Sequence, residues 1–218
     1  MFKYLIFDLD GTLINSEEGI KESLINSFKK AKIEILIPYQ NIEIGPPLDE
    51  TILLCNSGLN YEQLEKIKTF FREQYDFLYY KKLEVFNNVT LILDKFKRSK
   101  IEMFIATNKR YEPTLKIVNY LNWNKYFKNI YSIDRYYLET MSKTNMLKIL
   151  LEKEKILARE SLYIGDKYSD FIASSLNQIS FIGANWGGSD FYKKVHDFKI
   201  IDKINEESVN SLSSLFIK

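Results

Sequence analysis

The chain has little cysteine, little net charge and no long hydrophobic run. Cys55 is the single cysteine among 218 residues, so an internal disulfide is excluded and a reducing compartment is expected. The net charge of +2 is too small to indicate a nucleic-acid or membrane partner, because the lysines are mixed with glutamates. No stretch approaches the roughly 18 apolar residues of a membrane-spanning helix, and no basic and then apolar signal opens the chain. These absences favour a cytoplasmic protein.

The hydrophobic residues are sufficient for a sizeable core. They make up 45% of the chain and include 15 phenylalanines and 15 tyrosines. A length of 218 residues accommodates one full α/β domain and a modest insertion. An intrinsically disordered chain is therefore not expected.

Hydrophobic patterning predicts strands that alternate with helices over most of the chain. Residues 4–9 (YLIFDL) form an apolar run that ends at Asp10-Gly11, as expected of a buried strand followed by a turn. Further strands are predicted at 101–106, 130–133, 161–164, 179–182 and, at an edge, 200–201; helices are predicted at 89–98, near Pro113, and at 144–155, 171–176 and 206–216. This alternation predicts a Rossmann-like α/β core with a parallel sheet.

The segment that follows the first strand has helical patterning and no convincing buried strand. Helices are predicted from Ser16-Glu17 to about Lys30, over about 49–55 and over 61–80. A breaker cluster, Ile44-Gly45-Pro46-Pro47, lies between the first two. We therefore predict a core of residues 1–14 and 83–218 and a small all-α cap of residues 15–82.

Polar clusters follow three of the predicted strands. Asp8 and Asp10 lie in the sequence DLDGT after the first strand, TNK follows at 107–109, and GDKYSD follows at 165–170. Active sites of open parallel sheets form at the carboxyl ends of the strands. Four acidic side chains at two strand ends need a compensating cation, and Mg²⁺ is the natural one because it prefers oxygen ligands.

The ordered motifs resemble those of the haloacid dehalogenase-like hydrolase superfamily, and within it the phosphoglycolate-phosphatase-like branch. The sequence FDLDGTL at 7–13 matches the first motif, ATNK at 106–109 the second, and GDKYSD at 165–170 the fourth. Lys143 fits the lysine of the third motif, although Thr144 follows it where these sequences often have proline. The motifs occur in the order of the family and span most of the chain.

The resemblance implies a magnesium-dependent phosphatase that forms an aspartyl-phosphate on Asp8. Asp10 would act as general acid and then general base, since its side chain would point to the same side of an extended chain as Asp8. Lys143 would neutralise charge on Asp8 and on the phosphoryl group. These three residues are the predicted catalytic set.

The resemblance also implies which residues bind the phosphate and the metal. Gly11, Thr107 and Asn108 would bind the phosphoryl oxygens, with the glycine permitting a sharp turn of the main chain. The predicted metal ligands are Asp8, Asp10 through its main-chain carbonyl, Asp166, and Asp170, which would bind through water or orient Lys143.

The sequence of the insertion argues against several reactions of the superfamily, but it does not identify the substrate. Phosphonate hydrolases of the superfamily carry a lysine in the region of residues 41–57, and related sugar phosphomutases a serine–arginine pair; this chain has no lysine or arginine there. Dehalogenases lack the second aspartate, Asp10. The expected partner is a small phosphorylated metabolite, such as phosphoglycolate, a sugar phosphate, a nucleotide or pyrophosphate, and the protein is expected to be a monomer or homodimer. The alternatives are a phosphomutase or phosphotransferase, or a non-catalytic member that binds phosphate or a protein.

Other conspicuous residues are interpreted as structural. The reaction needs no histidine, so His196 is a surface or packing residue, and Cys55 is a packed residue of a cap helix. Asn177 ends a helix where glycine is frequent, and asparagine can adopt the left-handed conformation that a glycine would supply. Trp186-Gly187-Gly188 resembles a turn of this branch beside the site entrance. Whether Lys109 takes part in phosphate binding is left open.

Overall fold

The structure is a computed structural model that describes residues 1–44, 46–136, 141–189, 191 and 198–216. Gly45 and His196 lie outside these residues. The chain divides into two compact units, Met1–Asn15 with Val85–Lys218, and Ser16–Glu84. That the second unit acts as a cap stays a prediction.

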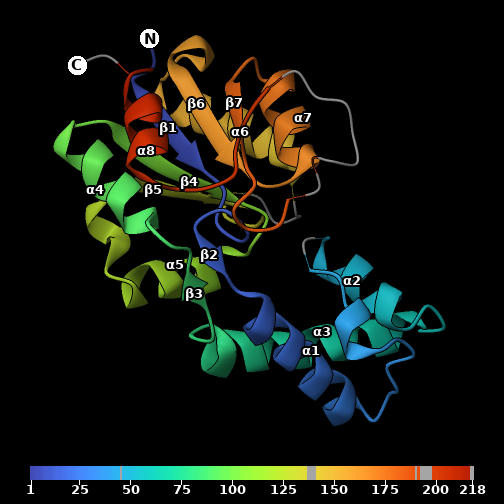
Figure 1. The fold of residues 1–218 in the computed structure, drawn as a ribbon. Coiled ribbons are helices and arrows are strands. Elements are labelled where there is room, and N and C mark those ends of the chain that lie inside the picture. The colour runs from blue at the N-terminus through green and yellow to red at the C-terminus, as the bar shows by residue number, and fades with distance from the viewer. Residues whose placement is uncertain (45, 137–140, 190, 192–197, 217–218) are drawn as a thin grey trace. The chain divides into compact units, whose positions relative to one another are not determined.

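The first unit is built on a six-stranded parallel sheet with helices on both faces (Figure 1). The strand order is β5-β4-β1-β6-β7-β8, which places β1 between β4 and β6. The strands are β1 (Tyr4–Phe7), β4 (Glu102–Thr107), β5 (Phe127–Ser132), β6 (Ser161–Gly165), β7 (Ser180–Ala184) and β8 (Lys199–Ile201). The predicted Rossmann-like α/β core is confirmed, including the position of β8 at an edge.

The helices of this unit are α4 (Val89–Arg98), α5 (Tyr111–Tyr120), α6 (Lys143–Glu154), α7 (Tyr168–Leu176) and α8 (Glu206–Ser213), with short 3-10 turns at η3 (Trp123–Lys125) and η4 (Ala158–Glu160). Ile6, Phe104 and Tyr163 contribute to the apolar cluster that includes Leu147 and Leu150 of α6. Figure 1 shows α4 and α8 side by side on the other face of the sheet. Burial of each large side chain stabilises the fold by roughly 1.5–3 kcal/mol.

The second unit is helical. It contains α1 (Glu17–Ala31), η1 (Tyr39–Asn41), α2 (Leu48–Cys55), α3 (Tyr61–Gln74) and a π-helical turn, η2 (Tyr75–Tyr79), so the single helix predicted at 61–80 changes its winding at Tyr75. Cys55 is buried in its apolar cluster, as predicted. Gly19 lets α1 approach the main chain closely, because a Cβ there would meet the carbonyls of Tyr79 and Lys82. Two short strands, β2 (Ile14–Asn15) and β3 (Glu84–Val85), form a separate two-stranded sheet.

The left-handed residue at the end of α7 is not Asn177. Asn177 has φ −97°, and the left-handed conformation is adopted by the next residue, Gln178, at φ 57°. The Asn177 amide instead donates hydrogen bonds to the carbonyls of Thr144 and Ala173, at 2.9 and 2.8 Å. Its side chain therefore links the end of α7 to the start of α6.

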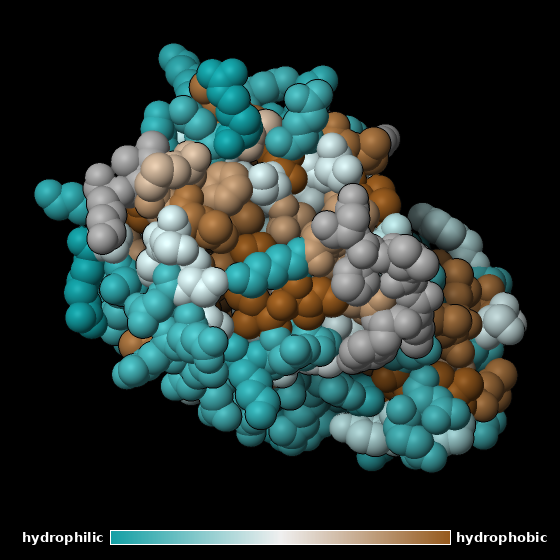
Figure 2. All heavy atoms as spheres, turned by 45° about the horizontal axis from the view of Figure 1, so that its top comes forward, coloured by the Kyte–Doolittle hydropathy of each residue, from teal (hydrophilic) through white to brown (hydrophobic). Residues whose placement is uncertain are grey.

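One face of the molecule can be followed in a space-filling view. Figure 2 shows hydrophilic residues over much of the visible face, with hydrophobic residues gathered between them. Among the described residues, no helix combines the length and the apolar character that crossing a bilayer requires.

Candidate active site

Asp8 lies directly after β1, at the carboxyl edge of the sheet. Its main-chain N–H donates to the carbonyl of Ile164 in β6 at 2.9 Å, and its side chain is buried. The chain then turns at Gly11, which has φ +82°. A Cβ at Gly11 would collide with the carboxylate of Asp166, so this position needs glycine both for its conformation and for space.

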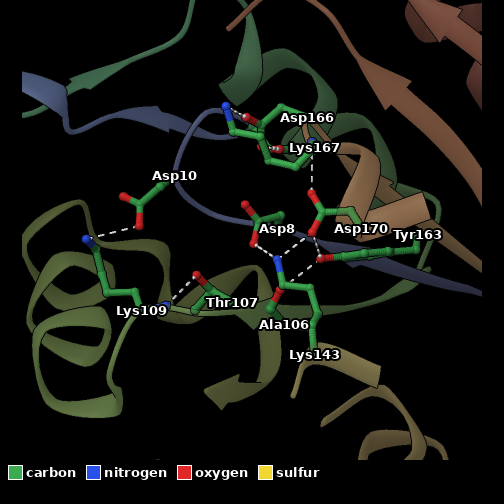
Figure 3. Close-up of polar contacts among 11 residues, drawn as sticks. Asp8, Asp10, Ala106, Thr107, Lys109, Lys143, Tyr163, Asp166, Lys167 and Asp170 are labelled. Carbon is green, nitrogen blue, oxygen red and sulfur yellow. Dashed lines mark hydrogen bonds and ion pairs between the residues drawn. The ribbon is translucent and has the colours of Figure 1, made fainter. Parts of the chain in front are cut away.

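Lys143 joins two of the carboxylates. It is the first residue of α6, where the side chain of Ser142 caps the helix by accepting from the N–H of Asn145. The Lys143 Nζ donates to Oδ1 of Asp8 and to Oδ1 of Asp170, each at 2.6 Å (Figure 3). Its side chain is only 8% exposed. The lysine predicted from the third motif thus lies against the predicted nucleophile.

Asp170 and Asp166 come from the segment after β6. Asp170 lies in the first turn of α7, where its Oδ2 accepts from the N–H of Lys167 at 3.1 Å and its Oδ1 lies 3.4 Å from the hydroxyl oxygen of Tyr163. Asp166 Oδ1 accepts from the Thr12 hydroxyl at 3.2 Å, so the fourth motif is hydrogen-bonded to the first. Both oxygens of Asp170 are already engaged, which suits a carboxylate that orients Lys143.

Three buried carboxylates, those of Asp8, Asp166 and Asp170, offer oxygen atoms that all lie within 4.8 Å of one another. Burial raises the pKa of Asp8 well above its usual range, and Asp170 and Asp166 add to the effect while Lys143 opposes it. Burial and the neighbouring Asp170 likewise raise the pKa of Asp166 to about 7. Burial alone would lower the pKa of Lys143, but Asp170 and Asp8 raise it well above its ordinary value. Lys143 lies against Asp8 and Asp170, and the Nζ of Lys167 lies 3.6 Å from Oδ2 of Asp166. Buried carboxylate oxygens this close together fit a cation that prefers oxygen ligands.

Asp10 does not join this cluster through its carboxylate. Figure 3 shows its side chain directed toward Lys109, whose Nζ lies 3.0 Å from Oδ2 of Asp10. Asp8 and Asp10 would point to the same side only in an extended chain, but β1 ends at Phe7 and the main chain turns at Gly11.

The residues of the second motif lie at the end of β4. The hydroxyl of Thr107 is buried and accepts from the N–H of Lys109 at 3.2 Å, while Asn108 is exposed. Thr107 and Asn108 are thus the last residue of β4 and the first residue after it, at the same edge of the sheet as Asp8.

Two contacts of the site were not anticipated from the sequence. The Tyr163 hydroxyl donates to the carbonyl of Ala106 at 3.1 Å and lies beside Asp170, but a tyrosine inside an apolar strand gave no signal of a polar role. The Trp186 indole donates to the carbonyl of Thr12 at 2.8 Å, and a Cβ on Gly187 would collide with the carbonyl of Gly11. The Trp-Gly-Gly turn therefore supports the loop that follows Asp8.

Comparisons with known proteins identify the family. The family described as haloacid dehalogenase-like hydrolase matches residues 5–184. A 5'-nucleotidase of Pseudomonas aeruginosa is 28% identical over 196 residues, which cover 88% of this chain and 87% of that protein. A phosphoglycolate phosphatase of Photobacterium profundum is 25% identical over 194 residues, covering 85% and 84%. The fold of a haloacid dehalogenase-like hydrolase from Streptococcus pneumoniae matches with a TM-score of 0.81 at 20% identity, over 98% of both chains. The chain belongs to the haloacid dehalogenase-like hydrolase family, as its four ordered motifs predicted.

Proposed function

We propose that this chain is a magnesium-dependent phosphatase that hydrolyses a small phosphorylated metabolite in the cytoplasm. The observation that carries the proposal is the buried carboxylate cluster, in which Lys143 lies 2.6 Å from both Asp8 and Asp170. A reactive carboxylate held beside a lysine at the carboxyl edge of a parallel sheet suits covalent phosphoryl transfer. Relatives named as a 5'-nucleotidase and a phosphoglycolate phosphatase support phosphorylated substrates.

The reaction that we propose has two steps. An oxygen of Asp8 attacks phosphorus, the bond from phosphorus to the leaving oxygen breaks, and Asp10 gives its proton to that oxygen. Water then attacks the aspartyl-phosphate, its proton passes to Asp10, and the bond between Asp8 and phosphorus breaks. Lys143 offsets negative charge on Asp8 and on the transferred group in both steps.

The phosphoryl oxygens would be held by Gly11, Thr107 and Asn108. The Thr107 hydroxyl oxygen accepts from the N–H of Lys109. The hydrogen of the Thr107 hydroxyl can therefore point toward a phosphoryl oxygen and donate to it. The left-handed conformation of Gly11 exposes main-chain groups at the turn that follows Asp8.

Asp8, Asp166 and the main-chain carbonyl of Asp10 would hold Mg²⁺, which when bound supplies positive charge beside the transferred phosphoryl group. The buried position of Asp166 and its raised pKa support this assignment, since burying a carboxylate is costly and the Nζ of Lys167, 3.6 Å away, leaves that pKa raised. We assign Asp170 to orienting Lys143, because its Oδ1 accepts from Lys143 and its Oδ2 from the N–H of Lys167.

The Ser16–Glu84 unit is proposed to act as the cap that selects the substrate. Its helices share an apolar cluster of their own, so the unit can keep its shape while it moves as one body. We propose that the substrate is a phosphomonoester or pyrophosphate of metabolite size.

Hydrolysis of p-nitrophenyl phosphate, measured with and without Mg²⁺, tests the proposal. We expect turnover that needs Mg²⁺ and that is abolished in Asp8→Asn but retained in Asp94→Asn, an aspartate of α4 that accepts from Tyr126. A panel of phosphorylated metabolites then ranks substrates, and phosphate release without transfer to an added alcohol separates a phosphatase from a phosphotransferase. No Mg²⁺-dependent turnover across the panel would contradict the proposal.

A further inference from the structure

Lys109 is a buried cation to which the proposed reaction gives no role. Its side chain is 7% exposed, and its Nζ lies 3.0 Å from Oδ2 of Asp10, whose side chain is 26% exposed. Lysine is rarely so deeply buried unless its charge is paired. The contact joins the first motif to the second, as Figure 3 shows.

The main chain on the lysine side of this pair is held by two hydrogen bonds. The N–H of Lys109 donates to the Thr107 hydroxyl at 3.2 Å, and the N–H of Tyr111 donates to Asp134 Oδ1 at 2.7 Å. The segment between the end of β4 and the start of α5 is thereby anchored at both ends. The main chain at Asp10 is held as well, by a bridge to Ile14 and by the hydrogen bond from the N–H of Gly11 to the carbonyl of Ile14 at 2.8 Å. What the ion pair can set is therefore the direction of the Asp10 carboxylate, which is the more exposed of the two side chains.

We propose that Lys109 is a positioning residue that holds the carboxylate of Asp10 at the angle and distance needed for proton transfer. The inference rests on the proposed function, in which Asp10 protonates the leaving oxygen and later takes a proton from water. Lys109 itself touches neither phosphorus nor the leaving oxygen and acts through Asp10. A lysine that instead held the phosphoryl group directly would affect phosphate binding, and this difference separates the two roles experimentally.

The proposal predicts a dependence on the leaving group. An alkyl alcohol is a poor leaving group and needs the proton of Asp10, whereas p-nitrophenolate departs readily without it. The ratio kcat/KM reports the steps up to formation of the aspartyl-phosphate, before water attacks. Loss of Lys109 should therefore lower kcat/KM for an alkyl phosphate far more than for p-nitrophenyl phosphate.

The experiment compares glycerol phosphate with p-nitrophenyl phosphate for wild type, Lys109→Met, Lys109→Gln and Lys109→Arg. We expect Lys109→Met to lower kcat/KM about 10- to 100-fold on glycerol phosphate and less than about threefold on p-nitrophenyl phosphate, since general acid catalysis contributes about 10²–10⁴-fold. Lys109→Arg should restore part of the loss, and the inhibition constant of inorganic phosphate should stay unchanged. Lys109→Gln, which keeps a hydrogen-bond donor, provides a second variant if the methionine variant does not fold. The matched control is Lys116→Met, a lysine of α5 paired with Glu112.

A double-mutant cycle completes the test. In an Asp10→Asn background, Lys109→Met should cause no further loss, because the residue through which it acts is already disabled. Equal losses on both substrates together with weaker phosphate inhibition would overturn the positioning role and assign Lys109 to the phosphoryl group. Full additivity in the double mutant would overturn it as well. Absence of wild-type turnover on both substrates would instead refute the proposed function, and the positioning role with it.

Discussion

Replacement of Lys143 by methionine should destabilise the core unit in a way that depends on pH. Lys143 is 8% exposed and lies 2.6 Å from both Asp8 and Asp170, so Lys143→Met leaves two buried carboxylates without their cation. Removing one partner of a buried ion pair costs about 3–5 kcal/mol, which is a large part of a typical unfolding free energy of about 5–15 kcal/mol. Urea unfolding at pH 7.5 in the presence of a chelator measures this loss.

The pH dependence follows from the direction of the pKa shift. Burial already raises the pKa of Asp8 well above its usual range, and loss of Lys143 removes the charge that opposes this rise. At low pH the Asp8 carboxyl takes up a proton and becomes neutral, so the loss of stability should be smallest near pH 5 and grow as the pH rises. Added Mg²⁺ should restore part of the stability at pH 7.5. The matched control is Lys148→Met, an exposed lysine of the same helix. A loss below about 1 kcal/mol, equal to that of the control and independent of pH, would refute the view that Lys143 holds the cluster together.

The remaining predictions concern the metal site and two glycines. Because folding raises the pKa of Asp166 to about 7, the folded chain binds more protons than the unfolded chain between about pH 4 and 7, and stability without Mg²⁺ should fall as the pH rises through this window. Asp166→Asn should therefore raise the unfolding free energy above pH 7 by up to about 4 kcal/mol, and it should abolish stabilisation by Mg²⁺. Urea unfolding at pH 5 and pH 8, with and without Mg²⁺, measures both effects. An unchanged response to Mg²⁺ would exclude Asp166 as a ligand. Gly19→Ala should lower the unfolding free energy by about 1–3 kcal/mol, since its Cβ would meet two main-chain carbonyls of the same unit. Gly58→Ala should change the unfolding free energy little, and thermal unfolding compares the two variants. Gly187→Ala should displace the Gly11 carbonyl and lower kcat/KM roughly 10- to 100-fold, and steady-state kinetics equal to wild type would show that the turn does not support the site.

The strands and helices of the core could be predicted closely because their patterns are local. The run at residues 4–9 predicted β1, and the short apolar runs near 161–164 and 179–182 predicted β6 and β7. The end of α7 was less predictable, because neighbouring residues compete for the same conformation. Asn177 could have been the left-handed residue, but its amide donates to two carbonyls and Gln178 adopts that conformation instead.

Parts of the site could be predicted from motif order, while other parts could not. Asp8, Lys143, Asp166 and Asp170 were identified from their motifs, and the structure brings all four side chains together. The orientation of Asp10 was not predictable, because alternation of side chains holds only while a strand remains extended and β1 ends before this residue.

By itself, the sequence determined the family, the alternation of strands and helices, and the residue types available for chemistry. These follow from local hydrophobic patterns and from short motifs, which need no knowledge of distant contacts. Only the tertiary structure decided how the motifs meet: that Lys143 bridges Asp8 and Asp170, and that Asp10 pairs with Lys109. Such pairings depend on strand order and on where each turn directs a side chain. They join residues far apart in the chain, because a buried charge pairs with an opposite charge that the fold brings close to it.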